Sequence, residues 1–200
     1  MKRMLLRYVG ALCAVGIFLL PHVASASVIT IIDNGDAGYS TTGAWLTWPS
    51  AGTQGDFDYK PIGDSATASW ALSGQTPGLY RVSVNWEAFD NRAVDAPYSV
   101  LDGATTLDTV RIDQTQAPND FTEGGVLWED LGVVGVYTLT GDMLTVRLSD
   151  LASPSGNLVI VIADAVRFER LSAIPIPAAV WLFGSGLLGL VSMARRKKTS

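Results

Sequence analysis

The chain has 200 residues, of which 48% are hydrophobic and 16% charged, and its formal net charge is −5. The apolar content excludes a disordered chain, and the negative charge argues against a nucleic-acid binder, which needs a basic surface. One cysteine and one histidine cannot supply an internal disulfide or a Cys/His zinc site.

Residues 1–26 have the layout of a secretory signal peptide. A basic start, an apolar run and a cleavage site of small residues follow one another: Lys2, Arg3 and Arg7, then residues 8–20, then Ala24 and Ala26. We expect cleavage after Ala26, and the alternative is an uncleaved anchor. Cleavage would also remove Cys13 and His22.

Residues 173–200 combine an apolar span with a basic end. Residues 174–194 contain no charge, and about 20 such residues suffice for a membrane-spanning helix. Two prolines precede the span and four basic residues follow it: Pro175 and Pro177, then Arg195, Arg196, Lys197 and Lys198. Because basic residues stay on the cytoplasmic side, we expect a transmembrane helix that leaves residues 27–172 outside. The adjacent charges disfavour the alternative, a buried core helix.

The order Pro-x-Pro, apolar span with Gly and Ser, and terminal basic cluster resembles a PEP-CTERM sorting signal, over about residues 174–198. Ile176 stands where the family name has Glu, as in the apolar subclass. The resemblance implies recognition by an exosortase in a Gram-negative bacterium that makes extracellular polysaccharide. It implies an exported protein, membrane-anchored before processing and then at the cell envelope or secreted.

All 19 acidic residues but only seven of the 14 basic residues fall within residues 27–172, which gives this segment a formal charge of −12. The segment contains no cysteine and no histidine. This excludes Ser–His–Asp and Cys–His catalysis and zinc sites built on His or Cys. Calcium remains open, since carboxylates and carbonyls suffice to bind it.

The segment 27–172 is patterned for strands. Tyr80, Val82, Val84 and Trp86 alternate with polar residues, which predicts a half-buried strand. Seven further strands are expected at residues 28–33, 66–72, 98–101, 106–113, 126–131, 136–139 and 144–148.

Residues 158–163 are apolar throughout and predict a central strand covered on both faces. Loops are expected at residues 50–55 and 115–125, and no stretch has sustained helical spacing. The sequence therefore predicts an all-β protein, an antiparallel β-sandwich with a jelly roll as its favoured form, between the signal peptide and the transmembrane helix.

A series of short motifs along this segment resembles the golvesin/xanthan-lyase carbohydrate-binding-like domain. In chain order they lie at residues 33–40, 42–45, 66–70, 77–82, 91–93, 96–98, 113–114, 131–132 and 163–168. The resemblance spans about residues 29–170. It implies a β-sandwich accessory module of secreted proteins, attached to polysaccharide-degrading enzymes.

Aromatic residues are the first candidates for ligand contact. Trp70 and Trp86 lie in strand patterns and are expected in the core. Trp45 and Trp48 lie in a Gly/Ser/Thr-rich segment with Tyr39 nearby, and exposed aromatic faces there could stack on sugar rings.

Charged residues give two further candidates. Asp33, Asp36 and Asp164 could supply calcium oxygens, although Asp is also an ordinary turn former and Ala44 breaks an EF-hand pattern. Arg92 could grip the carboxylate of a sugar acid, or it could form an internal ion pair with an aspartate such as Asp164.

The first functional hypothesis is a non-catalytic module that binds extracellular polysaccharide or contributes to a biofilm matrix. The second is a structural adhesion protein without a soluble ligand. The third is a lyase or hydrolase, since Tyr with Arg, or two carboxylates, suffice for such chemistry. The expected partners are exosortase, the secretion machinery, polysaccharide and the membrane. No nucleic acid and no cofactor besides structural calcium are expected.

Overall fold

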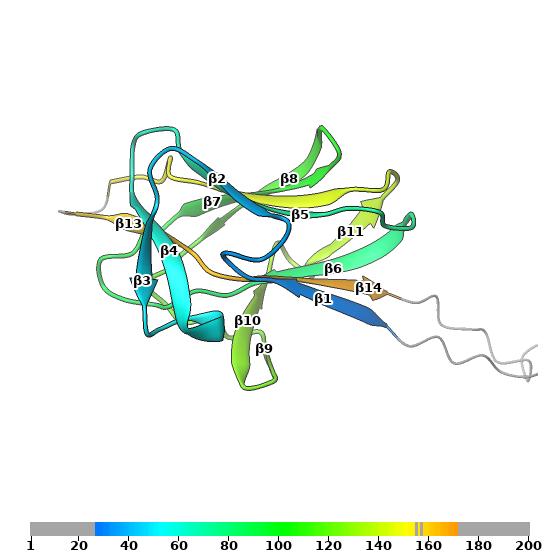
Figure 1. Cartoon of the computed structure of the whole chain (residues 1–200), viewed down its shortest axis with the longest axis horizontal. Coiled ribbons are helices and arrows are strands. Elements are labelled where there is room, and N and C mark those ends of the chain that lie inside the picture. The colour runs from blue at the N-terminus through cyan, green and yellow to red at the C-terminus, as the bar shows by residue number, and fades with distance from the viewer. Residues whose placement is uncertain (1–26, 155, 157, 172–200) are drawn as a thin grey trace, which may run out of the picture. The chain divides into compact units, whose positions relative to one another are not determined.

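The computed structural model describes residues 27–154, 156 and 158–171, all within one compact unit (Figure 1). The predicted signal peptide and the predicted sorting signal lie outside these residues. Within the described ranges, no helix is long and apolar enough to cross a membrane.

The described residues form strands and a single short 3-10 helix, η1 (Thr53–Gly55). The strands are β1 (Val28–Ile32), β2 (Tyr39–Thr42), β3 (Leu46–Pro49), β4 (Asp56–Pro61), β5 (Thr67–Leu72), β6 (Gly78–Val84), β7 (Ala96–Asp102), β8 (Thr105–Ile112), β9 (Phe121–Glu123), β10 (Val126–Asp130), β11 (Val136–Leu139), β12 (Leu144–Ser149), β13 (Ile160–Ala163) and β14 (Val166–Leu171).

These strands pair into three antiparallel sheets. The first has the order β1-β14-β6-β10-β9, with β11 also paired to β6, and the second has the order β2-β5-β12-β7-β8. A three-stranded sheet, β13-β4-β3, lies at one end of the molecule (Figure 1). The first and last strands lie side by side, with Val28 opposite Arg170.

Eight of the strands are divided equally between the two large sheets: β1, β5, β6, β7, β8, β11, β12 and β14. When these eight strands are numbered from one in chain order, β1, β14, β6 and β11 form one sheet in the order 1-8-3-6. The strands β5, β12, β7 and β8 form the other sheet in the order 2-7-4-5. This is the double Greek-key order of a jelly roll. The predicted all-β antiparallel sandwich is therefore confirmed, whereas the three-stranded sheet was not expected.

The core lies between the large sheets and follows the period-two pattern of the strands. In β6, Tyr80, Val82 and Val84 are at most 1% exposed, and the strands of the facing sheet contribute Trp70, Tyr98 and Val146. Trp70 and Trp86 are buried, as expected. Burial of each such side chain stabilises the fold by about 1.5–3 kcal/mol. Because a shift of one residue would move these side chains to the solvent face, their alternation fixes the register of the strands.

The expectation of a central strand at residues 158–163 is wrong in its position. β13 is an edge of its sheet and pairs with β4 alone. Val161 and Ile162 are nevertheless fully buried. The free edge of β13 is covered by residues 91–93, since the Ile160 N–H donates to Asn91 O at 3.1 Å and Ile160 O accepts from the Ala93 N–H at 2.9 Å.

The two expected loops contain structure. Residues 50–55 hold η1, and residues 115–125 hold β9, which forms a hairpin with β10. This hairpin projects from the end of the first sheet (Figure 1), and its turn forms one wall of the site described next.

Candidate functional site

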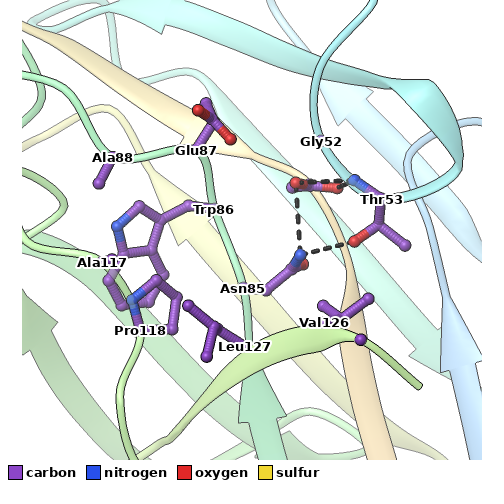
Figure 2. Close-up of a pocket in the computed structure, with 12 residues that line it drawn as sticks. Gly52, Thr53, Asn85, Trp86, Glu87, Ala88, Ala117, Pro118, Val126 and Leu127 are labelled. Carbon is purple, nitrogen blue, oxygen red and sulfur yellow. Dashed lines mark hydrogen bonds between the residues drawn. The ribbon is translucent and has the colours of Figure 1, made fainter. Parts of the chain in front are cut away.

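A pocket of about 370 Å³ opens where five connections between strands converge (Figure 2). They are the β3–β4 loop with η1, the segment after β6, the β8–β9 loop, the β9–β10 turn and the β13–β14 turn. Their contributions are Gly52 and Thr53; Asn85, Trp86, Glu87 and Ala88; Ala117 and Pro118; Gly125, Val126 and Leu127; and Asp164.

The pocket has an apolar side and a polar side. Trp86, Pro118 and Leu127 lie together on one side, and Thr53 and Asn85 lie on the other (Figure 2). The Trp86 ring is fixed, because its N–H donates to Gln116 O at 2.9 Å. An apolar wall facing polar groups suits a ligand that carries both kinds of surface.

Hydrogen bonds hold the polar side rigid. The Thr53 N–H donates to Asp164 Oδ1 at 2.9 Å, and Asn85 Nδ2 donates to Thr53 Oγ1 at 2.6 Å. Asn85 Oδ1 accepts from the Ala165 N–H at 2.9 Å. Because Thr53 Oγ1 only accepts here, its own hydroxyl proton is free to donate into the pocket.

Gly52 is required where it stands. Its φ is +88°, and a Cβ at this position would lie 2.3 Å from Asp56 O and 2.9 Å from Asp164 Oδ2. The glycine therefore lets the chain pass close enough to present the Thr53 N–H to the Asp164 carboxyl.

Asp164 forms a buried acid pair with Asp33, the residue that follows β1. The two side chains are 1% and 2% exposed, and each carboxyl shifts the pKa of the other. Burial is the main cause that raises the pKa of Asp33 to about 7 and that of Asp164 to about 8. Two buried carboxyls that interact in this way resist ionising together, so the pair retains a proton near neutral pH.

The acid pair is tied to the core. The Trp70 N–H donates to the backbone carbonyl of Asp164 at 3.1 Å, and this contact is fully buried. The strand ends that carry the pocket are thus anchored to the centre of the sandwich.

None of the aromatic candidates lines the pocket. The Tyr39 hydroxyl donates to Asp58 Oδ2 at 2.8 Å, and the ring lies 5.4 Å from that of Trp70. The Trp45 N–H donates to Thr42 O at 3.1 Å, and its ring packs against the core. Trp48 is 55% exposed on β3 and is the one of the three with a free aromatic surface.

Arg92 does not form the ion pair with Asp164 that was one of its two predicted roles. Its Nε donates to Glu87 O at 3.1 Å and its Nη1 to Asn91 Oδ1 at 2.7 Å. The guanidinium lies 5.6 Å from the Phe57 ring centroid and 5.7 Å from that of Phe89. Burial lowers the pKa of Arg92.

The three calcium candidates have separate roles. Asp33 and Asp164 meet in the acid pair, whereas Asp36 Oδ2 accepts from the Asp33 N–H at 3.0 Å and from Gln54 Nε2 at 3.2 Å. Among the described residues, no group of three or more His, Cys, Asp or Glu side chains is placed to hold a metal.

Sequence reasoning missed most of the pocket. Asn85 and Glu87 are the polar members of a strand pattern, which assigns them to solvent, and Thr53 lies in an expected loop. Asn85 and Asp164 are hydrogen-bonded although they are 79 positions apart. Asp164, which the sequence proposes as a calcium ligand or as an ion-pair partner of Arg92, is the one predicted site residue that the structure places at the pocket.

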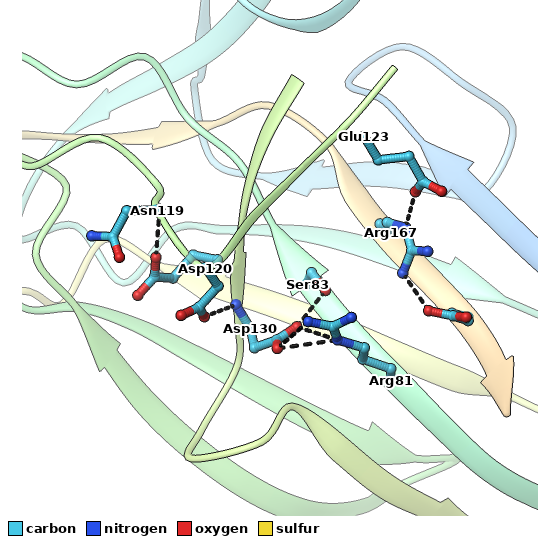
Figure 3. A network of polar contacts seen from close by, with 9 residues as sticks. Arg81, Ser83, Asn119, Asp120, Glu123, Asp130 and Arg167 are labelled. Carbon is cyan, nitrogen blue, oxygen red and sulfur yellow. Dashed lines mark hydrogen bonds and ion pairs between the residues drawn. The ribbon is translucent and has the colours of Figure 1, made fainter. Parts of the chain in front are cut away.

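A second polar network lies on the outer face of the first sheet (Figure 3). Arg81 forms a two-pronged ion pair with Asp130, with contacts of 2.7–3.1 Å. Arg167 is paired with Glu123 and Glu169. Both guanidiniums also lie over the ring of Phe121, so they clamp the β9–β10 hairpin to the sheet.

Comparison with known proteins identifies the family. The xanthan lyase of Bacillus sp. (strain GL1) is 32% identical over 146 residues, which are 69% of this chain and 14% of that protein. The structure of Paenibacillus xanthan lyase covers 72% of this chain with a TM-score of 0.54 at 24% identity, over 13% of its own chain. The CBM35 from Cellvibrio japonicus Abf62 covers 74% of this chain and 95% of its own, with a TM-score of 0.48 at 12% identity. The chain thus spans about one seventh of the curated relative, and, since residues 30–170 match the Golvesin C-terminal domain, it belongs to that family.

Proposed function

We propose that residues 27–172 act as a non-catalytic module that binds extracellular polysaccharide in the pocket between Trp86 and Asp164. The observation that carries the proposal is the two-sided lining of this pocket. The apolar wall of Trp86, Pro118 and Leu127 suits the C–H face of a sugar ring. The hydroxyl of Thr53 and the carboxylate of Glu87 suit sugar hydroxyls, because one donates and the other accepts.

The similarity to xanthan lyase supports a polysaccharide ligand. That relative is named for its action on xanthan, and this chain corresponds to 14% of it. So small a share favours an accessory module over the whole lyase activity.

The geometry of the acid pair supports binding rather than hydrolysis. In glycosidases the two carboxyls stand about 5–9.5 Å apart, on either side of the scissile bond. Asp33 and Asp164 are instead almost completely buried, and each shifts the pKa of the other. Carboxyls buried to this extent are not accessible to a glycosidic bond.

Affinity electrophoresis of the segment 27–172 in gels containing exopolysaccharide tests the proposal. The segment can be used alone, because the described residues form one compact unit with its own core. We expect retardation that Leu127→Ala and Glu87→Gln both weaken, while Trp48→Ala leaves it unchanged. Unretarded migration in a panel of polysaccharides, or loss of retardation only in Trp48→Ala, contradicts binding in the pocket. Release of reducing ends or unsaturated products would indicate an enzyme instead.

An adhesion role is the second candidate, and the edge strand β3 favours it. Leu46 and Trp48 are 53% and 55% exposed there, and β3 pairs with β4 on one side only. An exposed apolar edge can pair with another chain. Oligomers that Trp48→Lys dissolves would support adhesion, and a monomer at high concentration would contradict it.

We further propose export, and the support lies in sequence features outside the described residues. A signal peptide ending at Ala26 and a PEP-CTERM-like tail from Pro175 to Lys198 fit an exosortase substrate of a Gram-negative cell envelope. Cell fractionation with and without the exosortase tests this. Identical size and location in both strains would contradict sorting by that enzyme.

Structural calcium is also a proposal. A cation between Asp33 and Asp164 would take the place of their shared proton. A calcium-dependent rise in Tm that is absent in Asp164→Asn would support it. An unchanged Tm would contradict it.

A further inference from the structure

The charges around the pocket carry an inference about the class of sugar, which rests on the proposed function. The ionisable side chains that line the pocket are Glu87 and Asp164, both acidic, and no Lys, Arg or His joins them. The segment 27–172 has a formal charge of −12, so the wider field has the same sign.

The arginines near the pocket are engaged elsewhere. Arg167 is paired with Glu123 and Glu169, and Arg81 with Asp130. Arg92 lies four positions after Ala88, a pocket residue. Its Nε binds the backbone carbonyl of Glu87, while its guanidinium lies beside Phe57 and Phe89. Within the described residues, no cation thus lines the pocket, and the charge of Arg92 acts on the Glu87 carboxylate without lining the pocket itself.

The polar groups left free in the pocket match hydroxyl groups. The side chain of Glu87 is exposed and makes no hydrogen bond within the described residues, so its carboxylate can accept two or more. The Thr53 hydroxyl can donate, since Asn85 already occupies it as an acceptor. A hydroxyl can satisfy both groups, whereas a second carboxylate beside Glu87 would be repelled.

We propose that the pocket selects an uncharged sugar unit and excludes uronates, pyruvylated sugars and sulfated sugars. Glu87 is the residue that sets this preference, because it accepts ligand hydroxyls and repels ligand anions. Trp86 and Leu127 supply the contact with the ring, which is independent of charge.

A charge-matched pair of polymers tests the proposal. A uronate-containing polysaccharide and its carboxyl-reduced form share their linkages and differ at one group, which is a carboxylate in the first and an uncharged hydroxymethyl in the second. We expect the segment 27–172 to bind the reduced form at least tenfold more tightly by calorimetry at low salt. Glu87→Gln should reduce the difference in affinity between the two polymers, and Glu87→Lys should make the acidic polymer the tighter ligand. Asp142→Asn is the control, because Asp142 is exposed, is not among the pocket residues and also removes one negative charge.

The outcomes separate this inference from the proposed function. Equal or tighter binding of the acidic polymer overturns the charge preference and leaves polysaccharide binding intact. Binding of the acidic polymer only in the presence of calcium also overturns it, since a bridging cation would then recruit the anion. If neither polymer and no member of a panel of neutral polysaccharides binds the segment 27–172, the proposed function itself is overturned. If Glu87→Gln and Asp142→Asn reduce the difference in affinity between the two polymers equally, the preference comes from the net charge and not from Glu87.

Discussion

The guanidinium carbon of Arg81 lies 4.2 Å from the ring centroid of Phe121, and that of Arg167 lies 5.2 Å from the same ring. Arg81 is on β6 and Arg167 on β14, neighbouring strands of the first sheet, while Phe121 begins β9. Besides the pairing of β10 with β6, one aromatic ring and two cations thus hold the β9–β10 hairpin to the sheet. Since the same hairpin presents Gly125, Val126 and Leu127 to the pocket, this contact positions a pocket wall.

Replacing Phe121 by alanine should loosen the hairpin. Each cation–π contact is worth about 0.5–1 kcal/mol at a partly exposed site, and some apolar burial is lost as well. We expect a loss of about 1–3 kcal/mol in the free energy of unfolding and faster amide exchange at Val126 and Leu127. Thr122→Ala, an exposed neighbour on the same strand, is the control. Unchanged exchange in Phe121→Ala would show that other contacts hold the hairpin.

The acid pair should make stability depend on pH. The pKa of Asp164 is raised from 3.8 to about 8 in the fold, so the native state binds more protons than the unfolded state between these values. The free energy of unfolding therefore falls as pH rises from about 5 to 8, by up to about 1.4 kcal/mol per pH unit for each extra proton.

Urea unfolding of Asp164→Asn at pH 5, 6.5 and 8 tests this linkage. The amide keeps an acceptor for the Thr53 N–H and a donor for Asp33, so the variant should lose most of the slope. Asp142→Asn should retain it. A wild-type stability that is constant or rises over this range is incompatible with a shared proton.

The strands with clean alternation could be predicted from the sequence, and those without it could not. No strand is expected at the charged segment Asp-Phe-Asp-Tyr-Lys-Pro, which forms β4, yet Phe57 is 3% and Lys60 7% exposed. Lys60 tolerates burial because it pairs with Asp64. Arg167 in β14 is 3% exposed for the same reason, since Glu123 and Glu169 neutralise it. For Arg167 one of these partners, Glu123, lies 44 positions away, where a local sequence pattern does not show it.

The pocket could be predicted only in part for a related reason. By sequence its five segments are separate loops, turns and strand ends, and the pocket exists only because the jelly-roll connectivity brings them together. Sequence reasoning drew attention to Asp164, which lies at the pocket. It also drew attention to Trp45, whose N–H and ring are engaged by Thr42 and the core. The presence of an aromatic residue in a loop does not show whether its ring faces the solvent or the core.

The buried hydrogen bond from the Trp70 N–H to the Asp164 carbonyl should contribute more to the free energy of unfolding than the partly exposed one from the Trp45 N–H to Thr42 O. Trp70→Phe removes the donor and leaves a buried carbonyl without it, which costs about 1–3 kcal/mol. Trp45→Phe removes a similar bond to Thr42 O at a partly exposed position, where water can replace it. We expect urea unfolding to show a loss at least twice as large for Trp70→Phe. Equal losses would mean that the buried carbonyl finds another donor.

Alanine variants at two glycines with positive φ distinguish the cost of backbone strain from the cost of a steric clash at the pocket. Gly52 and Gly63 have φ of +88° and +112°, so alanine at either position incurs a strain of about 1–3 kcal/mol. A Cβ at Gly63 meets nothing within 4 Å, whereas at Gly52 it would lie 2.3 Å from Asp56 O. Gly52→Ala must therefore also displace Thr53 from Asp164. We expect it to destabilise the fold by more than Gly63→Ala and to weaken polysaccharide binding, measured by urea unfolding and affinity electrophoresis. If the two variants behave alike in both measurements, the close approach at Gly52 does not hold the polar side of the pocket in place.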